Sequence, residues 1–527
     1  MHPVELFEVI VAMFVAVLVL HYIAQRLSLP PAVALLIGGG TLAFVPGLPP
    51  VELDPELVLV VFLPPLLMDG AWFTALAPFR RHLAGIASLA IGAVLFTTAA
   101  VALAAKAVVP ELPWAACIAL GAIVSPPDAV SARAVLQRVT LPRRLATLLE
   151  GESLLNDATG LVLFRFAVAA TLTGTFSLGE AVGSFTLLVG GGLLVGGAIG
   201  ALWVLVLRRL GDDYLMIAAS VLVCWVSYLT GELFHVSGVI ATVTAGLVCG
   251  WYQHTVFTAS VRLRGVAFWQ VLIFLLEAAV FVLIGLSLRG VLERVGGIGV
   301  VWTDMAGAVA AVIAAMTLAR FAWVFGADAV LRRLHARGVR GAEPLGGRAA
   351  TVMSWAGMRG VVTLAVALSL PETMPGRDLM LVVAFAAILV TVLVQGTTLG
   401  LVIRWAGLSE DERAHPPLDL FAAEAAMVEA QLAAVERNAF SADGTLLHPR
   451  LLDSYRRRAS LSANFSGDAA ERDESINAHF DVILAAIAAG RAELVRLHRT
   501  HQIDDETLHD LERDLDLEEL GAIAAKG

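Results

Sequence analysis

Long apolar runs separated by short polar stretches follow one another along the chain and stop after Leu401. A helix needs about 20 apolar residues to cross the ~30 Å hydrocarbon layer of a membrane, and most of the runs approach that length. About thirteen candidate spans can be placed, near residues 5–24, 30–45, 57–75, 83–105, 112–132, 144–172, 181–207, 214–230, 234–252, 266–288, 304–330, 349–370 and 379–403. The pattern therefore predicts an all-α polytopic membrane domain over residues 1–404.

The composition agrees with a membrane domain and marks where it ends. Hydrophobic residues make up 58% of the 527 residues and charged residues only 16%, against ~25% charged in soluble proteins. Residues 405–527 contain 24 acidic and 12 basic residues, so we expect a second, acidic domain there. Within it, alanine, leucine and paired charges predict helices at 421–440, 476–500 and from 504 onward, with a loop at 454–468.

Basic residues in the connections between spans predict the orientation, because cytoplasmic loops carry an excess of lysine and arginine. One alternate set of connections holds seventeen basic residues: Arg26, Arg80, Arg81, Arg133, Arg138, Arg143, Arg144, Arg208, Arg209, Arg262, Arg264, Arg332, Arg333, Arg337, Arg340, Arg348 and Arg404. The other set holds four: Lys106, Arg289, Arg294 and Arg377. The asymmetry predicts an inner-membrane protein with its N-terminus outside and its C-terminal domain in the cytoplasm.

Two of the predicted spans are interrupted, and at corresponding places. Span 112–132 contains Ser-Pro-Pro-Asp at 125–128, and span 349–370 contains Gly-Met-Arg-Gly at 357–360. Each is the fifth of six spans if the first six and the last six form two halves around the seventh. Broken helices at matching places indicate two inverted repeats whose unwound segments cross at a midplane ion site, because the freed backbone groups must face a cavity.

Few ionisable residues lie inside the predicted spans. A charge at the centre of a span costs roughly 2.5–3.5 kcal/mol on insertion scales, so each one is a functional candidate. They are Asp69, Asp128, Glu150, Glu152, Asp157, Arg165, Glu277, Arg320 and Arg359. Structural ion pairs explain Glu150, Arg165, Glu277 and Arg320 equally well, and Glu277 with Arg320 is a candidate pair. Asp157 stands out because Ser153, Asn156 and Thr159 surround it with the oxygen atoms that hard cations prefer.

The segment EGESLLND at 150–157 resembles the Asn-Asp signature of monovalent cation:proton antiporters, in the branch of bacterial NhaP-type proteins and animal sodium/proton exchangers. Further segments resemble that family in the same order: FLPPLLMDGAW at 62–72, GAIVSPPDAVSARAV at 121–135, EAAVFVLIGLSL at 277–288 and SWAGMRGVVTLAVAL at 354–368. The resemblance covers residues 5–404. It implies a secondary transporter and not an enzyme, a homodimer without cofactors that exchanges Na⁺ for H⁺ one for one by alternating access.

The resemblance also implies a role for each residue of the site. Asp157 would bind either the monovalent cation or the proton, with Asn156 beside it and Ser153 as a ligand or hydrogen-bond donor. Asp128 would offset the positive N-terminal ends of the broken helices, and Arg359 the negative C-terminal ends.

Three further expectations concern neighbouring positions. The resemblance implies that Glu152 and Arg359 form a buried ion pair beside the site. Position 69 is Asp where the family usually has Glu, and position 127 is Pro where many members have Thr. Asp69 and Pro127 are therefore candidate determinants of ion selectivity, which the sequence leaves open between Na⁺, K⁺ and Li⁺.

Other functions and partners are weaker candidates. A selective cation channel is the alternative from another class, although no filter loop is visible in the sequence. Two membrane aspartates would also suit an intramembrane aspartic protease, but that family's Tyr-Asp and Gly-x-Gly-Asp motifs are absent from the sequence. Membrane lipid is the expected partner and nucleic acid is not, and nothing in the sequence identifies a regulatory ligand for the C-terminal domain.

Overall fold

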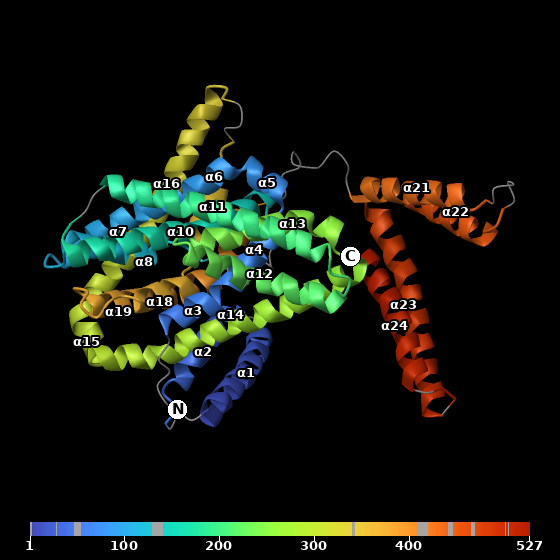
Figure 1. Ribbon diagram of the computed structural model, residues 1–527, viewed down its shortest axis with the longest axis horizontal. Coiled ribbons are helices and arrows are strands. Elements are labelled where there is room, and N and C mark those ends of the chain that lie inside the picture. Colours follow the sequence, from blue (N-terminus) through green and yellow to red (C-terminus); the bar gives the residue numbers. More distant parts are fainter. Residues whose placement is uncertain are drawn as a thin grey trace. The chain divides into compact units, whose positions relative to one another are not determined.

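The computed structural model describes residues 3–27, 29–46, 54–128, 141–175, 178–339, 343–408, 420–440, 446–464, 469–500, 502–503 and 505–526. Regular secondary structure in these residues is helical, apart from one isolated bridge between Phe440 and Leu446. The prediction of an all-α protein is therefore confirmed. The chain forms two compact units, Met1–Glu410 and Asp411–Gly527, and each is described by itself (Figure 1).

Unit 1 contains most of the helices. They are α1 (Pro3–Arg26), α2 (Pro31–Leu42), α3 (Pro55–Val61), α4 (Leu63–Trp72), α5 (Leu76–Arg81), α6 (Leu83–Ala87), the π-helical η1 (Ser88–Ala93), α7 (Val94–Val108), α8 (Trp114–Val124), α10 (Arg143–Thr173), α11 (Leu178–Leu207), α12 (Asp213–Leu233), α13 (Gly238–Val256), α14 (Ala259–Val295), α15 (Ile298–Val300), the π-helical η2 (Val301–Met305), α16 (Ala306–Ala336), α17 (Gly347–Trp355), α18 (Val361–Leu368), α19 (Arg377–Val390), the π-helical η3 (Thr391–Gln395) and α20 (Gly396–Ala406).

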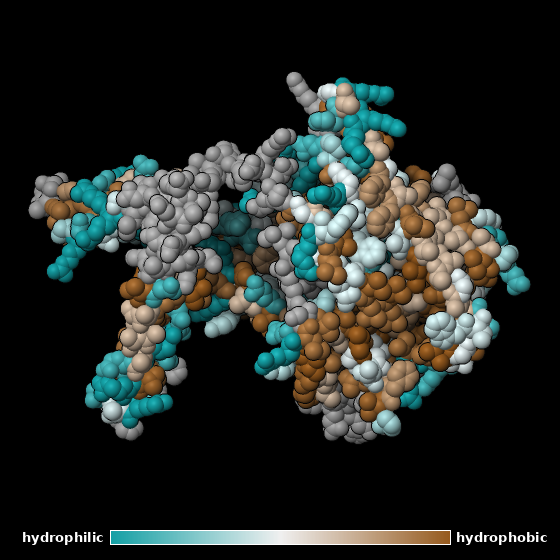
Figure 2. Space-filling model, turned by 180° about the vertical axis from the view of Figure 1, so that it is seen from behind, coloured by the Kyte–Doolittle hydropathy of each residue, from teal (hydrophilic) through white to brown (hydrophobic). Residues whose placement is uncertain are grey.

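The surface of unit 1 is that of a membrane protein. In the described part of the chain, eight helical stretches are long and apolar enough to cross a membrane, and three shorter apolar helices accompany them. Large apolar side chains point outward, such as Leu194 of α11, which is 77% exposed. Figure 2 shows apolar residues over much of one face of this unit. So much exposed apolar surface suits lipid and not water, so unit 1 is a multi-pass membrane domain. The count of thirteen spans stays a prediction.

Proline and the glycine-containing segment interrupt two helices at the places that the sequence indicated. α8 ends at Val124, just before Pro126-Pro127, because proline has no N–H group to continue the helical hydrogen bonds. α17 and α18 are separated by the non-helical residues 356–360. The part of span 112–132 that follows Asp128 lies outside the described residues, as do Arg133, Arg138 and Arg340 of the charge count. Both interruptions thus leave backbone groups without helical partners inside the membrane domain.

The helices of unit 1 pack in two groups. In the first group, α4 packs against α12 and α13, α11 packs against α12 and α13, and α2 packs against α1 and α14. In the second group, α8 packs against α7 and α10, and α16 packs against α7 and α17. Contacts of α10 with α4 and α13, and of α18 with α3, join the groups. The two interrupted helices and the Asn-Asp pair on α10 therefore belong to the same group.

Unit 2 consists of α21 (Leu420–Asn438), α22 (Pro449–Asn464), α23 (Ala469–Arg499) and α24 (Asp505–Lys526). α21 packs against α22, and α23 packs against α24. Three of these helices were expected, but the loop predicted at 454–468 is wrong over its first part, where α22 runs to Asn464. Arginine, leucine and alanine favour helix there, and Leu452 gains burial, being only 4% exposed.

Candidate functional site

A backbone hydrogen bond joins the two interrupted segments. The N–H group of Asp128 donates to the carbonyl oxygen of Met358 at 2.7 Å. Neither residue is helical, so this bond satisfies one donor and one acceptor that the helix breaks leave free. α8 also packs against α18 and α19. The non-helical segment that follows α8 and the one between α17 and α18 therefore meet at this point.

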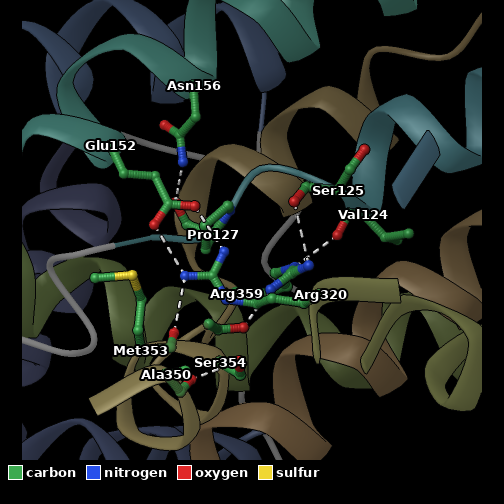
Figure 3. Close-up of polar contacts among 11 residues, drawn as sticks. Val124, Ser125, Pro127, Glu152, Asn156, Arg320, Ala350, Met353, Ser354 and Arg359 are labelled. Carbon is green, nitrogen blue, oxygen red and sulfur yellow. Dashed lines mark hydrogen bonds and ion pairs between the residues drawn. The ribbon is translucent and has the colours of Figure 1, made fainter. Parts of the chain in front are cut away.

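Arg359 closes the C-terminal end of α8. Its side chain is buried, and it donates to the carbonyl oxygen of Val124 at 2.5 Å from Nε and to that of Ser125 at 3.2 Å from Nη2 (Figure 3). It also donates to the carbonyl oxygen of Gly357. The last carbonyl groups of a helix lack helical partners and carry partial negative charge, so a cation is favourable there. The positive charge of Arg359 thus stabilises the free carbonyl groups at the C-terminal end of α8.

Asp128 lies against the start of α18. Gly360 is the residue before that helix, and a side-chain carbon at position 360 would collide with the Asp128 carboxylate. Gly357 plays the same part for Arg320, whose side chain occupies the space that a Cβ at position 357 would need. Because the N-terminal end of a helix carries partial positive charge, Asp128 is well placed beside α18. The two glycines of the interrupted segment therefore allow charged groups to approach the crossing closely.

Glu152 pairs with Arg320 and not with Arg359. Its carboxylate, buried on α10, accepts hydrogen bonds from Nη1 and Nη2 of Arg320 on α16 at 2.6 Å and 2.9 Å (Figure 3). Nη2 of Arg320 also donates to the carbonyl oxygen of Met353 at 3.2 Å. The predicted pair of Glu152 with Arg359 is therefore wrong, because Arg359 is held by the end of α8. The candidate pair of Glu277 with Arg320 is wrong too, since the acidic partner of Arg320 among the described residues is Glu152.

Asn156 and Asp157 bring polar oxygen atoms to the unwound end of α8. Asn156 is completely buried, and its Nδ2 donates to the carbonyl oxygen of Pro127 at 2.6 Å. Its Oδ1 is also buried but accepts no hydrogen bond from any described residue. The Asp157 side chain is only 8% exposed, receives no hydrogen bond within the described residues, and is near enough to Asp128 for their charges to repel. A hard cation or a proton would relieve both the repulsion and the missing bonds.

The remaining predicted site residues lie around this centre. Ser153 is half-buried on α10, one turn before Asp157 and therefore on the same helix face. Asp69 is half-buried on α4, one of the helices of the first group that pack against α10. Glu277 is half-buried on α14. The structure thus assembles Asp157 with its neighbours from α8 and α10, and it brings the helix of Asp69 alongside.

Asp157 is buried and Asp128 is half-buried, and they lie where two interrupted membrane helices meet. This arrangement can be compared with known proteins. The sequence model of a family described as sodium/hydrogen exchanger, transmembrane, matches residues 10–405. This chain belongs to the sodium/hydrogen exchanger family. As a member it is a secondary transporter and not an enzyme, which confirms the resemblance that the Asn-Asp segment indicated.

Individual relatives of this exchanger agree with the family match. An uncharacterised Na⁺/H⁺ exchanger of Mycobacterium tuberculosis is 33% identical over an alignment of 529 positions, gaps included, that covers 97% of this chain and 95% of that protein. A sodium, potassium, lithium and rubidium/H⁺ antiporter of Bacillus subtilis is 32% identical over 74% of this chain and 60% of its own length. The solved structure of the sodium proton antiporter MjNhaP1 from Methanocaldococcus jannaschii matches 79% of this chain and 100% of its own, with a TM-score of 0.61 and 19% identity. That structure supports the fold.

Sequence reasoning missed hydroxyl groups that help to hold the crossing in this exchanger. Thr391 in η3 accepts a hydrogen bond from the backbone N–H of Arg359 at 3.0 Å and donates to the carbonyl oxygen of Ala387 at 2.7 Å. The hydroxyls of Thr98 and Ser125 share a hydrogen bond of 2.6 Å at the end of α8. Single hydroxyls in apolar runs form no sequence pattern. Their only signal is a polar side chain within a span, and many such side chains bond only to their own helix.

Proposed function

We propose that this exchanger moves one Na⁺ in exchange for one H⁺ across the cell membrane, without net charge transfer and by alternating access. The observation that carries the proposal is Asp157, a buried carboxylate to which no described residue donates a hydrogen bond. One carboxylate can hold a cation or a proton but not both. Each ion must therefore leave before the other binds, which couples the two fluxes without a further device.

The neighbours of Asp157 have separate tasks in this proposal. Asn156 offers its buried Oδ1 to the cation, and Ser153 offers a hydroxyl from the same face of α10. Asp128 adds negative charge, and Asp69 lies on the helix group that faces α10. Rocking of the second helix group against the first would expose Asp157 to either side in turn.

Proteoliposomes provide the direct test of exchange. We expect a Na⁺ pulse to drive proton flux in vesicles that contain the purified chain, and we expect an imposed membrane potential to leave the rate unchanged. Empty liposomes are the control. Because one positive charge crosses for each that returns, a clear dependence on voltage would rule out one-for-one exchange. Na⁺ movement without proton movement would favour the cation channel.

Exchange of K⁺ for H⁺ is the second candidate function, and two observations favour testing it. The relative from Bacillus subtilis is described as an antiporter of several alkali cations, and Asp69 and Pro127 depart from the usual family residues. If these positions loosen the site, discrimination between Na⁺ and K⁺ is modest. The double substitution Asp69→Glu with Pro127→Thr should then shift preference towards Na⁺ or Li⁺ in the vesicle assay. An unchanged preference would show that neither position sets selectivity.

We further propose thirteen spans in two inverted repeats, with the N-terminus outside and the C-terminal domain in the cytoplasm. In this arrangement Glu111 faces outward and Arg337 faces the cytoplasm, and both are exposed. A cysteine at position 111 should react with an impermeant thiol reagent added to intact cells, and one at 337 should react only after lysis. The unmodified chain is the control, because its three cysteines are buried. The reverse labelling would contradict the orientation.

The assembly in the membrane is proposed to be a homodimer, as the family resemblance implies. The acidic domain at 405–527 is proposed to be cytoplasmic and regulatory. Light scattering of the detergent-purified chain, with the detergent contribution subtracted, should give twice the mass of 55.6 kDa. A monomer mass would contradict the dimer.

A further inference from the structure

A large cavity of unit 1 lies away from the candidate ion site. Its volume is about 950 Å³, and it is lined by the C-terminal ends of α4 and α13, the loop before α5 and its first turn, Arg208 after α11, α12 and the beginning of α14. This size is near the top of the range of roughly 300–1,000 Å³ found for ligand sites in proteins. None of the proposed ion-site residues lines it. The cavity is therefore a separate feature that ion exchange does not explain.

The walls of this cavity are rich in aromatic residues, and the indole nitrogens of Trp72 and Trp269 already have hydrogen-bond partners. Trp269 is 4% exposed and donates from its indole nitrogen to the hydroxyl of Ser220 at 3.0 Å. Trp72 donates to the side-chain oxygen of Gln253 at 3.0 Å, and its ring stacks on that of Phe257. What these residues present to the cavity is their apolar surface. Such walls suit a hydrocarbon chain.

Two arginines at the cavity carry positive charge that no described carboxylate neutralises. Arg208 lies over the ring of Tyr252 at 5.7 Å, and Arg262 donates to the carbonyl oxygen of Phe257 at 2.5 Å. Both side chains are exposed and line the cavity. Arg264 differs, because Asp213 lies 3.8 Å from it. The cavity thus combines an apolar interior with two exposed cations.

We propose that this cavity binds an anionic phospholipid, with an acyl chain between the aromatic walls and the phosphate between Arg208 and Arg262. Anionic lipid headgroups attract basic side chains near the membrane surface, and the acyl chain of the lipid would pack against the apolar walls. The orientation proposed above puts both arginines at the cytoplasmic face, so the lipid comes from the inner leaflet. Only the choice of leaflet rests on that orientation, because the contacts are the same in either leaflet.

Native mass spectrometry of the detergent-purified full chain, titrated with dioleoyl phosphatidylglycerol, tests the proposal. We expect Arg208→Gln and Arg262→Gln each to weaken binding of the first lipid about fivefold, since one basic residue contributes about a factor of this size. Arg209→Gln is the matched control: it removes the neighbouring exposed arginine, which does not line the cavity, and should change nothing. Dioleoyl phosphatidylcholine should bind more weakly than phosphatidylglycerol, and inorganic phosphate should not compete.

A cavity-filling substitution tests the acyl-chain part separately. Gly265 of α14 lines the cavity, and a Cβ there would meet only ordinary contact with Ile217, at 3.7 Å. Gly265→Leu should therefore fold and reduce phosphatidylglycerol binding more than tenfold, while Gly265→Ala binds nearly as the unmodified chain does. Equal binding of both lipids, or unchanged binding by the two arginine variants and Gly265→Leu, would overturn the proposal. Sodium/proton exchange is measured separately in vesicles, so failure of one proposal is distinguishable from failure of the other.

Discussion

Asp157→Asn should reduce Na⁺-driven proton flux in proteoliposomes to the level of empty vesicles. The substitution keeps the size of the side chain but removes the group that holds either ion. The purified variant should melt at the same temperature as the unmodified chain or higher, because the substitution removes a buried group whose charge no hydrogen bond from a described residue stabilises. Asp304→Asn is the matched control, since Asp304 is exposed in η2, outside the site, and its loss should leave exchange intact. Substantial exchange by Asp157→Asn would remove Asp157 from the mechanism.

The same competition predicts the pH dependence of the unmodified exchanger. A proton on Asp157 excludes the cation, so the share of molecules able to bind Na⁺ falls as the pH is lowered. Below the pH at which half of the molecules carry this proton, the apparent KM for Na⁺ should rise about tenfold per pH unit. The maximal rate should change little, because saturating Na⁺ displaces the proton. An apparent KM that does not change with pH would show that cation and proton do not share the carboxylate.

Loss of either partner of the Glu152–Arg320 pair should destabilise the protein by roughly 3–5 kcal/mol, because the remaining charge is buried without its counter-ion. Glu152→Gln and Arg320→Gln should each lower the melting temperature in detergent markedly. Arg165→Gln, on α10 like Glu152, is the control. It breaks only the exposed pair with Glu232, and such pairs contribute about 0.2–1 kcal/mol.

A double-mutant cycle separates this pair from the one that the sequence suggested. Glu152→Gln combined with Arg320→Gln should cost clearly less than the two single effects added, because residues in direct contact are not additive. Glu152→Gln combined with Arg359→Gln should come closer to additivity, since Arg359 bonds to Val124 and Ser125 instead. Stronger coupling of Glu152 to Arg359 than to Arg320 would contradict the structure.

Much of this protein could be predicted from local sequence. Apolar runs long enough for lipid indicated a membrane domain, and the shift in charge near 405 indicated a second one. Pro126-Pro127 and the Gly-Met-Arg-Gly segment indicated where two helices break, because proline lacks a donor and glycine admits close neighbours. The Asn156-Asp157 pair indicated the family. Each of these signals acts within a few residues of its own position, so it can be recognised from the amino-acid sequence alone.

The partners of the buried charges depended on tertiary structure. Arg320 and Arg359 are both arginines within apolar helices, and nothing near either one in the sequence says which of them faces Glu152. The packing of α16 beside α17 turns Arg320 to Glu152, while the crossing of the unwound segments leaves Arg359 beside the free carbonyls of α8. Hydrophobic spacing shows that a helix is buried but says little about which helix lies opposite. A buried charge pairs with whatever cation the fold brings within about 3 Å, and that choice is made in three dimensions.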